Sequence, residues 1–137
     1  MIIQDFSIDE YNWKVKVFYD IEDWAIPMIV DEVKLLGPYE EDIEDIYESL
    51  AKRTPNTGYI YSNIIDGKSV IIIEKTTSAA EFQDTFDHEK GHLAMHISIA
   101  KKIDPFSEEF QYLNGTIGHE MFKVAKRFLC DHCRSKE

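Results

Sequence analysis

The sequence predicts an α+β fold in which a short sheet packs against helices. Residues 11–19 alternate between apolar and polar side chains, and residues 58–75 have the pattern of an isoleucine-rich hairpin. Four other segments repeat apolar residues at the helical period. The predicted order is strand, two helices, two strands and two helices, in a single domain over residues 1–137. A chain of 137 residues can bury one proper core but not two.

The first half of the chain predicts one strand and two helices. The strand 11–19 has an apolar face formed by Trp13, Val15, Val17 and Tyr19. Residues 22–36 follow with a helical pattern that ends at Gly37, a residue typical of the position just after a helix. Residues 39–52 predict a second, acidic helix, which the turn-forming segment 54–58 stops.

A hairpin is predicted next, with strands 58–62 and 68–75 around the turn Asp66-Gly67. The segment 76–78 (Thr-Thr-Ser) then offers a cap for the following helix. An exposed hairpin edge could bind an extended peptide by β-augmentation, so the hairpin is a candidate rim of a cleft. The alternative is that it is ordinary core sheet.

The segment 88–92 reads His-Glu-Lys-Gly-His, the pattern H-E-x-x-H. Residues four apart share one face of a helix, so His88 and His92 can both turn a ring nitrogen toward one metal ion. Glu89 lies about 100° further around the helix, where it can take a proton from a metal-bound water. These are the groups that zinc hydrolysis requires.

The periodicity of the motif helix assigns its faces. The apolar stripe consists of Phe82, Phe86, Leu93, Ile97 and Ala100. The two histidines, Glu89 and Thr85 lie along one flank of this stripe, where a site would sit if the helix floored a cleft. Lys90 belongs to the other, polar flank, and Gly91 would let a neighbouring element approach the metal face. The alternative is a surface helix that carries two histidines by chance.

A catalytic zinc normally takes a third protein ligand. The downstream candidates are His96, Asp104, Glu108, Glu109, His119 and Glu120. His96 lies one further turn along the helix, too far for all three histidines to contact one ion easily. We interpret it as a packing or supporting residue. The three acidic residues at 104–109 lie at the break Asp104-Pro105 and at the start of the next helix. We interpret them as residues that cap this helix and offset its dipole.

Glu120 is the strongest candidate for the third ligand. It lies within the helical segment 116–129 and flanks the apolar stripe, where a carboxylate is costly unless it meets a cation. The alternatives are a solvated helix glutamate at this position, or His119 as the ligand.

Residues 88–96 resemble the H-E-x-G-H-x-x-x-H segment of the ImmA/IrrE family of short zincin-like metallopeptidases. The resemblance covers roughly residues 68–130 and implies a small, gluzincin-like domain with one zinc ion per chain. It implies His88, His92 and Glu120 as zinc ligands and Glu89 as the base. Lys90 departs from the usual apolar residue, and residues 118–125 lack the family's Glu-Ala-Asn-x-Phe-Ala pattern.

The composition limits the partners and the cellular location that we expect for the protein. The formal net charge of −11 argues against nucleic-acid binding and against anionic membrane surfaces. It fits a basic partner or substrate, but acidic charge also serves solubility alone, which is the preferred interpretation. The sequence has no membrane span and no signal pattern, so we expect a cytoplasmic protein. Cys130 and Cys133 could hold a metal or form a redox pair, and are interpreted as reduced thiols.

Three functions are therefore open. The first is a zinc metallopeptidase that hydrolyses a peptide bond in a cytoplasmic protein, for which the resemblance suggests a transcriptional regulator. Tyr59, Tyr61 and Tyr112 are candidate donors to its oxyanion. The second is a catalytically silent binding module with the same fold. The third is a structural metal site, which would need a fourth protein ligand such as His119 or His96.

Overall fold

The computed structural model describes residues 1–134, in which a four-stranded sheet has the order β1-β2-β4-β3. β1 (Ile2–Ile8) and β2 (Trp13–Tyr19) form an antiparallel hairpin. β3 (Gly58–Asn63) and β4 (Lys68–Ile73) form a second one. The two hairpins join through a parallel pairing of β2 with β4, which leaves β1 and β3 as the edge strands.

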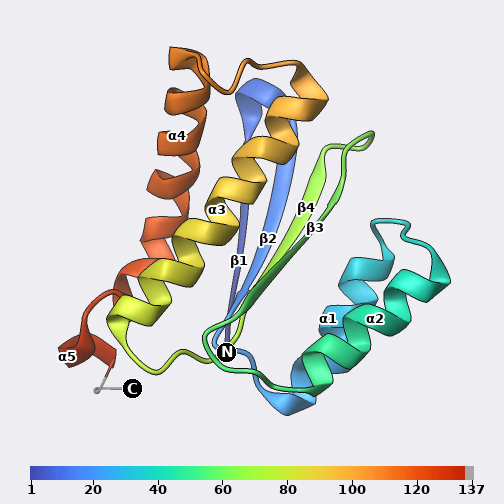
Figure 1. Cartoon of the computed structure of the whole chain (residues 1–137), viewed down its shortest axis with the longest axis vertical. Helices are drawn as coiled ribbons and strands as arrows, with labels where there is room; N and C mark the ends of the chain where they lie inside the picture. Colours follow the sequence, from blue (N-terminus) through green and yellow to red (C-terminus); the bar gives the residue numbers. More distant parts are fainter. Residues whose placement is uncertain (135–137) are drawn as a thin grey trace.

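Helices cover both faces of the sheet (Figure 1). α3 (Ala79–Lys101) and the antiparallel α4 (Glu108–Ala125) lie on one face, and α1 (Ile26–Lys34) and α2 (Glu40–Ala51) lie on the other. The α3–α4 side buries the predicted apolar face of β2, formed by Trp13, Val15, Val17 and Tyr19. The opposite side buries Phe18 of β2 with the α1 and α2 residues. The α+β class predicted from the sequence is confirmed.

Local signals explain where the helices begin and end. α1 begins at Ile26 with Pro27 in its first turn, and it ends at Lys34, shortly before Gly37, whose φ of +79° suits glycine. The Ser78 hydroxyl accepts a hydrogen bond from the Glu81 backbone N–H and caps α3. In the same way Ser107 caps α4, which begins eight residues before the helical pattern read from Thr116. A short helix, α5 (Asp131–Arg134), follows. None of the helices within residues 1–134 is long and apolar enough to cross a membrane.

The edge strand β1 was not predicted. Its buried position Gln4 is polar, which hides the alternation expected of a strand. Both polar groups of the Gln4 amide form hydrogen bonds in the structure. The Tyr19 hydroxyl donates to Gln4 Oε1 (2.7 Å), and Gln4 Nε2 donates to the Glu120 carbonyl (2.8 Å). β1 is therefore fastened to α4 through the backbone of Glu120.

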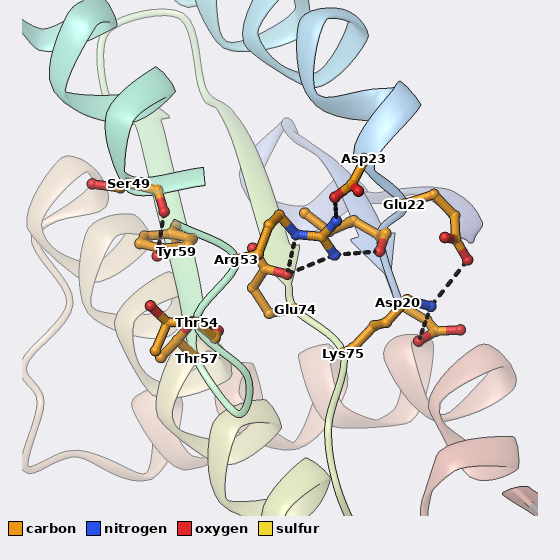
Figure 2. Close-up of polar contacts among 11 residues, drawn as sticks. Asp20, Glu22, Asp23, Ser49, Arg53, Thr54, Thr57, Tyr59, Glu74 and Lys75 are labelled. Carbon is orange, nitrogen blue, oxygen red and sulfur yellow. Dashed lines mark hydrogen bonds and ion pairs between the residues drawn. The ribbon is translucent and has the colours of Figure 1, made fainter. Parts of the chain in front are cut away.

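A buried ion pair joins the end of α2 to the end of β4 (Figure 2). The Arg53 guanidinium contacts Glu74 Oε2 at 3.2 Å, pairs with Asp23, and donates to the Ile21 carbonyl (2.8 Å). The Glu74 side chain is only 1 % exposed. Burial raises the pKa of Glu74, and the nearby Arg53 opposes that rise. This carboxylate therefore depends on Arg53 for its charged form.

Replacing Arg53 with Met should destabilise the fold by about 2–3 kcal/mol at neutral pH, because it leaves the Glu74 carboxylate buried without a cation. Without Arg53 the pKa of Glu74 rises further, so the variant should lose stability as the pH rises through that pKa. Urea unfolding of wild type and variant at mildly acidic and neutral pH measures both effects.

The control is Lys34→Met, which breaks the exposed Lys34–Asp31 pair and should change stability by less than about 0.5 kcal/mol. Equal stability losses in the two variants would contradict the role assigned to Arg53.

Candidate functional site

The motif residues lie on α3, and the two histidine rings converge. Nε2 of His88 and Nε2 of His92 are 3.1 Å apart, and both residues are exposed. Two imidazole nitrogens on one tetrahedral zinc, each about 2.0–2.1 Å from the metal, would be separated by about 3.3 Å. The pair therefore fits a zinc ion as two of its ligands.

Glu89 lies beside the pair but is buried, with an exposed fraction of 4 %. Burial raises the pKa of its carboxyl, and the two neighbouring histidines partly offset that rise. A carboxylate with a raised pKa is a better proton acceptor than an ordinary glutamate once it is ionised. The three residues of the motif thus combine an exposed pair of ring nitrogens with a shielded base.

A cavity opens next to Glu89, with a volume of about 280 Å³. Residues of α3 and of the turn before β3 line it: Asn56, Thr57, Gly58, Asp84, Thr85, His88 and Glu89. The Thr85 hydroxyl donates to the Asn56 carbonyl (2.9 Å) and holds the turn against the helix. The flank of α3 that the periodicity marked as a site does border a cavity.

The close approach of β3 to α3 depends on Gly58. A Cβ atom at this position would lie 2.7 Å from Glu89 Cγ and 2.9 Å from Thr85 Cγ2. Gly91 was expected to allow such an approach, and that expectation is wrong: a Cβ at Gly91 would meet nothing within 4 Å. The sequence placed Gly58 after a helix stop and at the start of a predicted strand, which did not indicate that α3 would approach it.

His96 supports the arrangement from one turn further along α3. Its Nδ1 is hydrogen-bonded to the Ser62 hydroxyl of β3 (2.7 Å), and Ser62 contacts the Ser69 hydroxyl (2.6 Å). Ser69 in turn accepts a hydrogen bond from the indole N–H of buried Trp13 (2.9 Å). Burial and the nearby His92 lower the pKa of His96, which favours its neutral form. This chain of contacts fixes α3 to β3 and gives His96 the supporting role expected for it.

Glu120 does not join the histidines. Its carboxylate forms an ion pair with Lys123 (2.7 Å), and within residues 1–134 no group of three or more His, Cys, Asp or Glu side chains is placed to hold a metal. The reason is the packing of α4. A Cβ at Gly118 would lie 3.6 Å from Lys90 Nζ, so α4 faces the Lys90 flank of α3, about 200° around the helix from His88.

Other candidates also lie elsewhere. His119 is exposed on α4, and Glu109 accepts a hydrogen bond from the Tyr11 hydroxyl (3.0 Å). Asp104 accepts from the backbone N–H of Phe106 (2.9 Å), so it stabilises a turn. Tyr112 is 74 % exposed on α4. The remaining acidic candidate, Glu108, lies in the first turn of α4, where its negative charge interacts favourably with the helix dipole.

The two tyrosines of β3 lie nearer to the motif. The Tyr59 hydroxyl is engaged with the Ser49 carbonyl (3.4 Å; Figure 2), whereas Tyr61 lies close enough to Glu89 to be affected by its charge. Burial and this charge raise the pKa of Tyr61 to about 12, so its hydroxyl keeps its proton. Tyr61 nevertheless packs on the α1–α2 side of the sheet, and none of the three candidate tyrosines is among the residues that line the cavity beside Glu89.

Cys130 and Cys133 lie at α5, outside the motif, and are exposed. A hydrogen bond from Cys133 contributes to lowering the pKa of the Cys130 thiol. Asp131 accepts a hydrogen bond from the first backbone N–H of α3, at Ala79 (2.8 Å), which holds α5 at the start of that helix. The cysteine pair is thus separate from the histidine pair.

Gly58→Ala should destabilise the fold by about 1–3 kcal/mol, because the added methyl overlaps Glu89 and Thr85. Gly91→Ala is the matched control: with open space around it in a helix interior, it should stabilise by up to about 1 kcal/mol. Urea unfolding of both variants gives the comparison. A Gly58→Ala protein as stable as wild type would show that α3 and β3 are not in this contact.

Comparison of the chain with models of protein families, with curated proteins and with solved structures finds no match.

Proposed function

We propose that this chain is a zinc-dependent peptide hydrolase in which His88 and His92 hold the metal and Glu89 is the general base. The observation that carries the proposal is the convergence of two ring nitrogens, 3.1 Å apart, beside a buried carboxylate and a cavity. The resemblance to the ImmA/IrrE family supports it, because a helix carrying H-E-x-x-H on a small sheet is the zincin-like arrangement.

Zinc bound at this pair would supply Lewis-acid chemistry by polarising a carbonyl and acidifying water. The chain's own part in the reaction is proton transfer. Glu89 takes a proton from the attacking water and passes it to the nitrogen of the leaving amine. Its burial restricts access of bulk water to the carboxyl and holds it beside the histidines.

The substrate would be an extended segment of a cytoplasmic protein, for which the family resemblance suggests a transcriptional regulator. β3 is an edge strand, and its residues Gly58 and Ser62 lie against Glu89 and His96. A peptide that pairs with the outer edge of β3 would therefore run past the histidine pair. This pairing gives the peptide backbone a defined position relative to the base.

One observation favours a second candidate, a catalytically silent binding module. The expected third ligand, Glu120, pairs with Lys123 on the other side of α3 and takes no part in the proposed site. Two histidines hold zinc less firmly than three protein ligands do. A chain with this arrangement could bind an extended peptide at β3 without cutting it. A structural metal site has less support. It would need a further ligand such as His96, and the Nδ1 of His96 is hydrogen-bonded to the Ser62 hydroxyl.

Zinc binding should require the histidine pair but not Glu120. The double variant His88→Ala/His92→Ala should lose zinc in equilibrium dialysis, because it removes both converging nitrogens. Glu120→Ala should bind zinc as wild type does, since its carboxylate pairs with Lys123. Full zinc content in the double variant would show that His88 and His92 do not hold the metal. Zinc loss in Glu120→Ala would show that α4 supplies a ligand.

Glu89→Gln distinguishes the enzyme from the binding module. Glutamine has nearly the same shape but cannot accept a proton at neutral pH, so hydrolysis of a library of fluorescence-quenched peptides should fall by about 10²–10⁴-fold. Zinc content and helical circular dichroism should stay at wild-type levels. Cleavage that persists undiminished in the variant would exclude Glu89 as the base, and a wild-type chain that cuts no peptide would favour the binding module.

A further inference from the structure

A groove of about 780 Å³ lies between α2 and the last part of β3. Hydrogen bonds close it at both ends. At one end Asn63 Nδ2 donates to the Leu36 carbonyl in the α1–α2 connection (2.9 Å). At the other, the Tyr59 hydroxyl donates to the Ser49 carbonyl of α2 (3.4 Å; Figure 2). These contacts hold α2 and the α1–α2 connection against β3 on either side of the groove.

The groove follows the outer edge of the sheet. β3 pairs with β4 on one side only, so backbone groups along its other edge have no strand partner. Its side chains alternate between the two helical layers. Ile60 packs toward the α3 side, whereas Tyr59 and Tyr61 pack toward the α2 side. An added strand would follow the same alternation and present every second side chain to the groove.

The groove wall is acidic. Asp42 and Asp45 of α2 line it and are exposed, and no Lys, Arg or His is among the residues that line it. In the described part of the chain neither carboxylate forms an ion pair. Tyr61 of β3 lines the same groove, where the charge of Asp45 acts on its hydroxyl.

We propose that this groove receives the lysine or arginine side chains of an extended peptide that adds to the outer edge of β3. Apolar side chains at the alternate positions of that peptide would face α3, beside Ile60. The chain's net charge of −11 adds a long-range attraction for a basic segment. The inference rests on the proposed function for the identity of the peptide as a substrate, and it supplies the selectivity of that site.

The test is fluorescence anisotropy with a labelled peptide of alternating valine and lysine, using Glu89→Gln protein so that no peptide is consumed. The matched peptide alternates valine and glutamate. Asp42→Asn/Asp45→Asn should weaken binding of the lysine peptide by about threefold to tenfold, and should reduce its dependence on salt. Glu44→Gln/Glu48→Gln removes the same charge from α2 outside the groove, at a separate surface, and should change the affinity by less than about twofold.

Several results would overturn the inference. These are equal binding of the glutamate peptide, equal weakening by the two double variants, no binding of the lysine peptide to a monomeric chain, and no binding of it to a chain that sediments as a dimer. In the last case a second copy would occupy the edge of β3. N-methylation of alternate peptide amides should abolish binding, and unchanged binding would exclude strand addition.

The proposed function fails separately. Selective binding of the lysine peptide, without hydrolysis of any peptide by the wild-type chain, would support the groove assignment and contradict the peptidase activity. Hydrolysis of the peptide library with no preference for basic residues would support the peptidase activity and contradict the groove assignment.

Discussion

The contact between α3 and the edge strand β3 is the constraint on which the candidate site depends. Because Gly58 has no side chain, the backbone of β3 comes close enough to cover Glu89 and Thr85. This cover buries the Glu89 carboxyl and raises its pKa, while the neighbouring histidines remain exposed at the rim. The contact with Gly58 thus shields the Glu89 carboxylate, while the ring nitrogens beside it stay accessible.

The other flank of α3 shows why Glu120 does not lie beside the histidines. α4 packs there, with Lys90 beside Gly118, and Glu120 is drawn toward β1 by the hydrogen bond from Gln4 to its carbonyl. In this packing the Glu120 carboxylate pairs with Lys123 on the α4 side of α3 and does not lie beside the histidines. The flank of α3 that carries the histidine pair is the one next to the edge strand β3, to which we propose that an extended peptide adds.

Much of the fold follows from local signals in the sequence. The alternation around Trp13 predicted β2, the isoleucine run predicted β4, and the segment 76–78 contained Ser78, the cap of α3. β1 escaped prediction because a polar residue, Gln4, occupies one of its buried positions, and its two hydrogen-bond partners are distant in sequence. Local alternation does not reveal a buried polar side chain whose partners come from elsewhere.

The site was predicted in part for a related reason. The helical period placed Glu89, Thr85 and the histidines on one flank of α3, and the structure has a cavity there. The period does not say which neighbour covers each flank. Lys90 was expected on a polar face, but it lies against α4, and the glycine that permits close packing proved to be Gly58. Such assignments require the tertiary arrangement.

X-ray absorption at the zinc edge of the zinc-loaded chain tests the central claim most directly, because it identifies the atoms that contact the metal. The structure predicts a first shell of light atoms with the scattering pattern of two imidazole rings, at about 2.0–2.1 Å. Sulfur at about 2.3 Å would place the metal at Cys130 and Cys133. That result, or a shell without imidazole, would contradict a zinc site on α3.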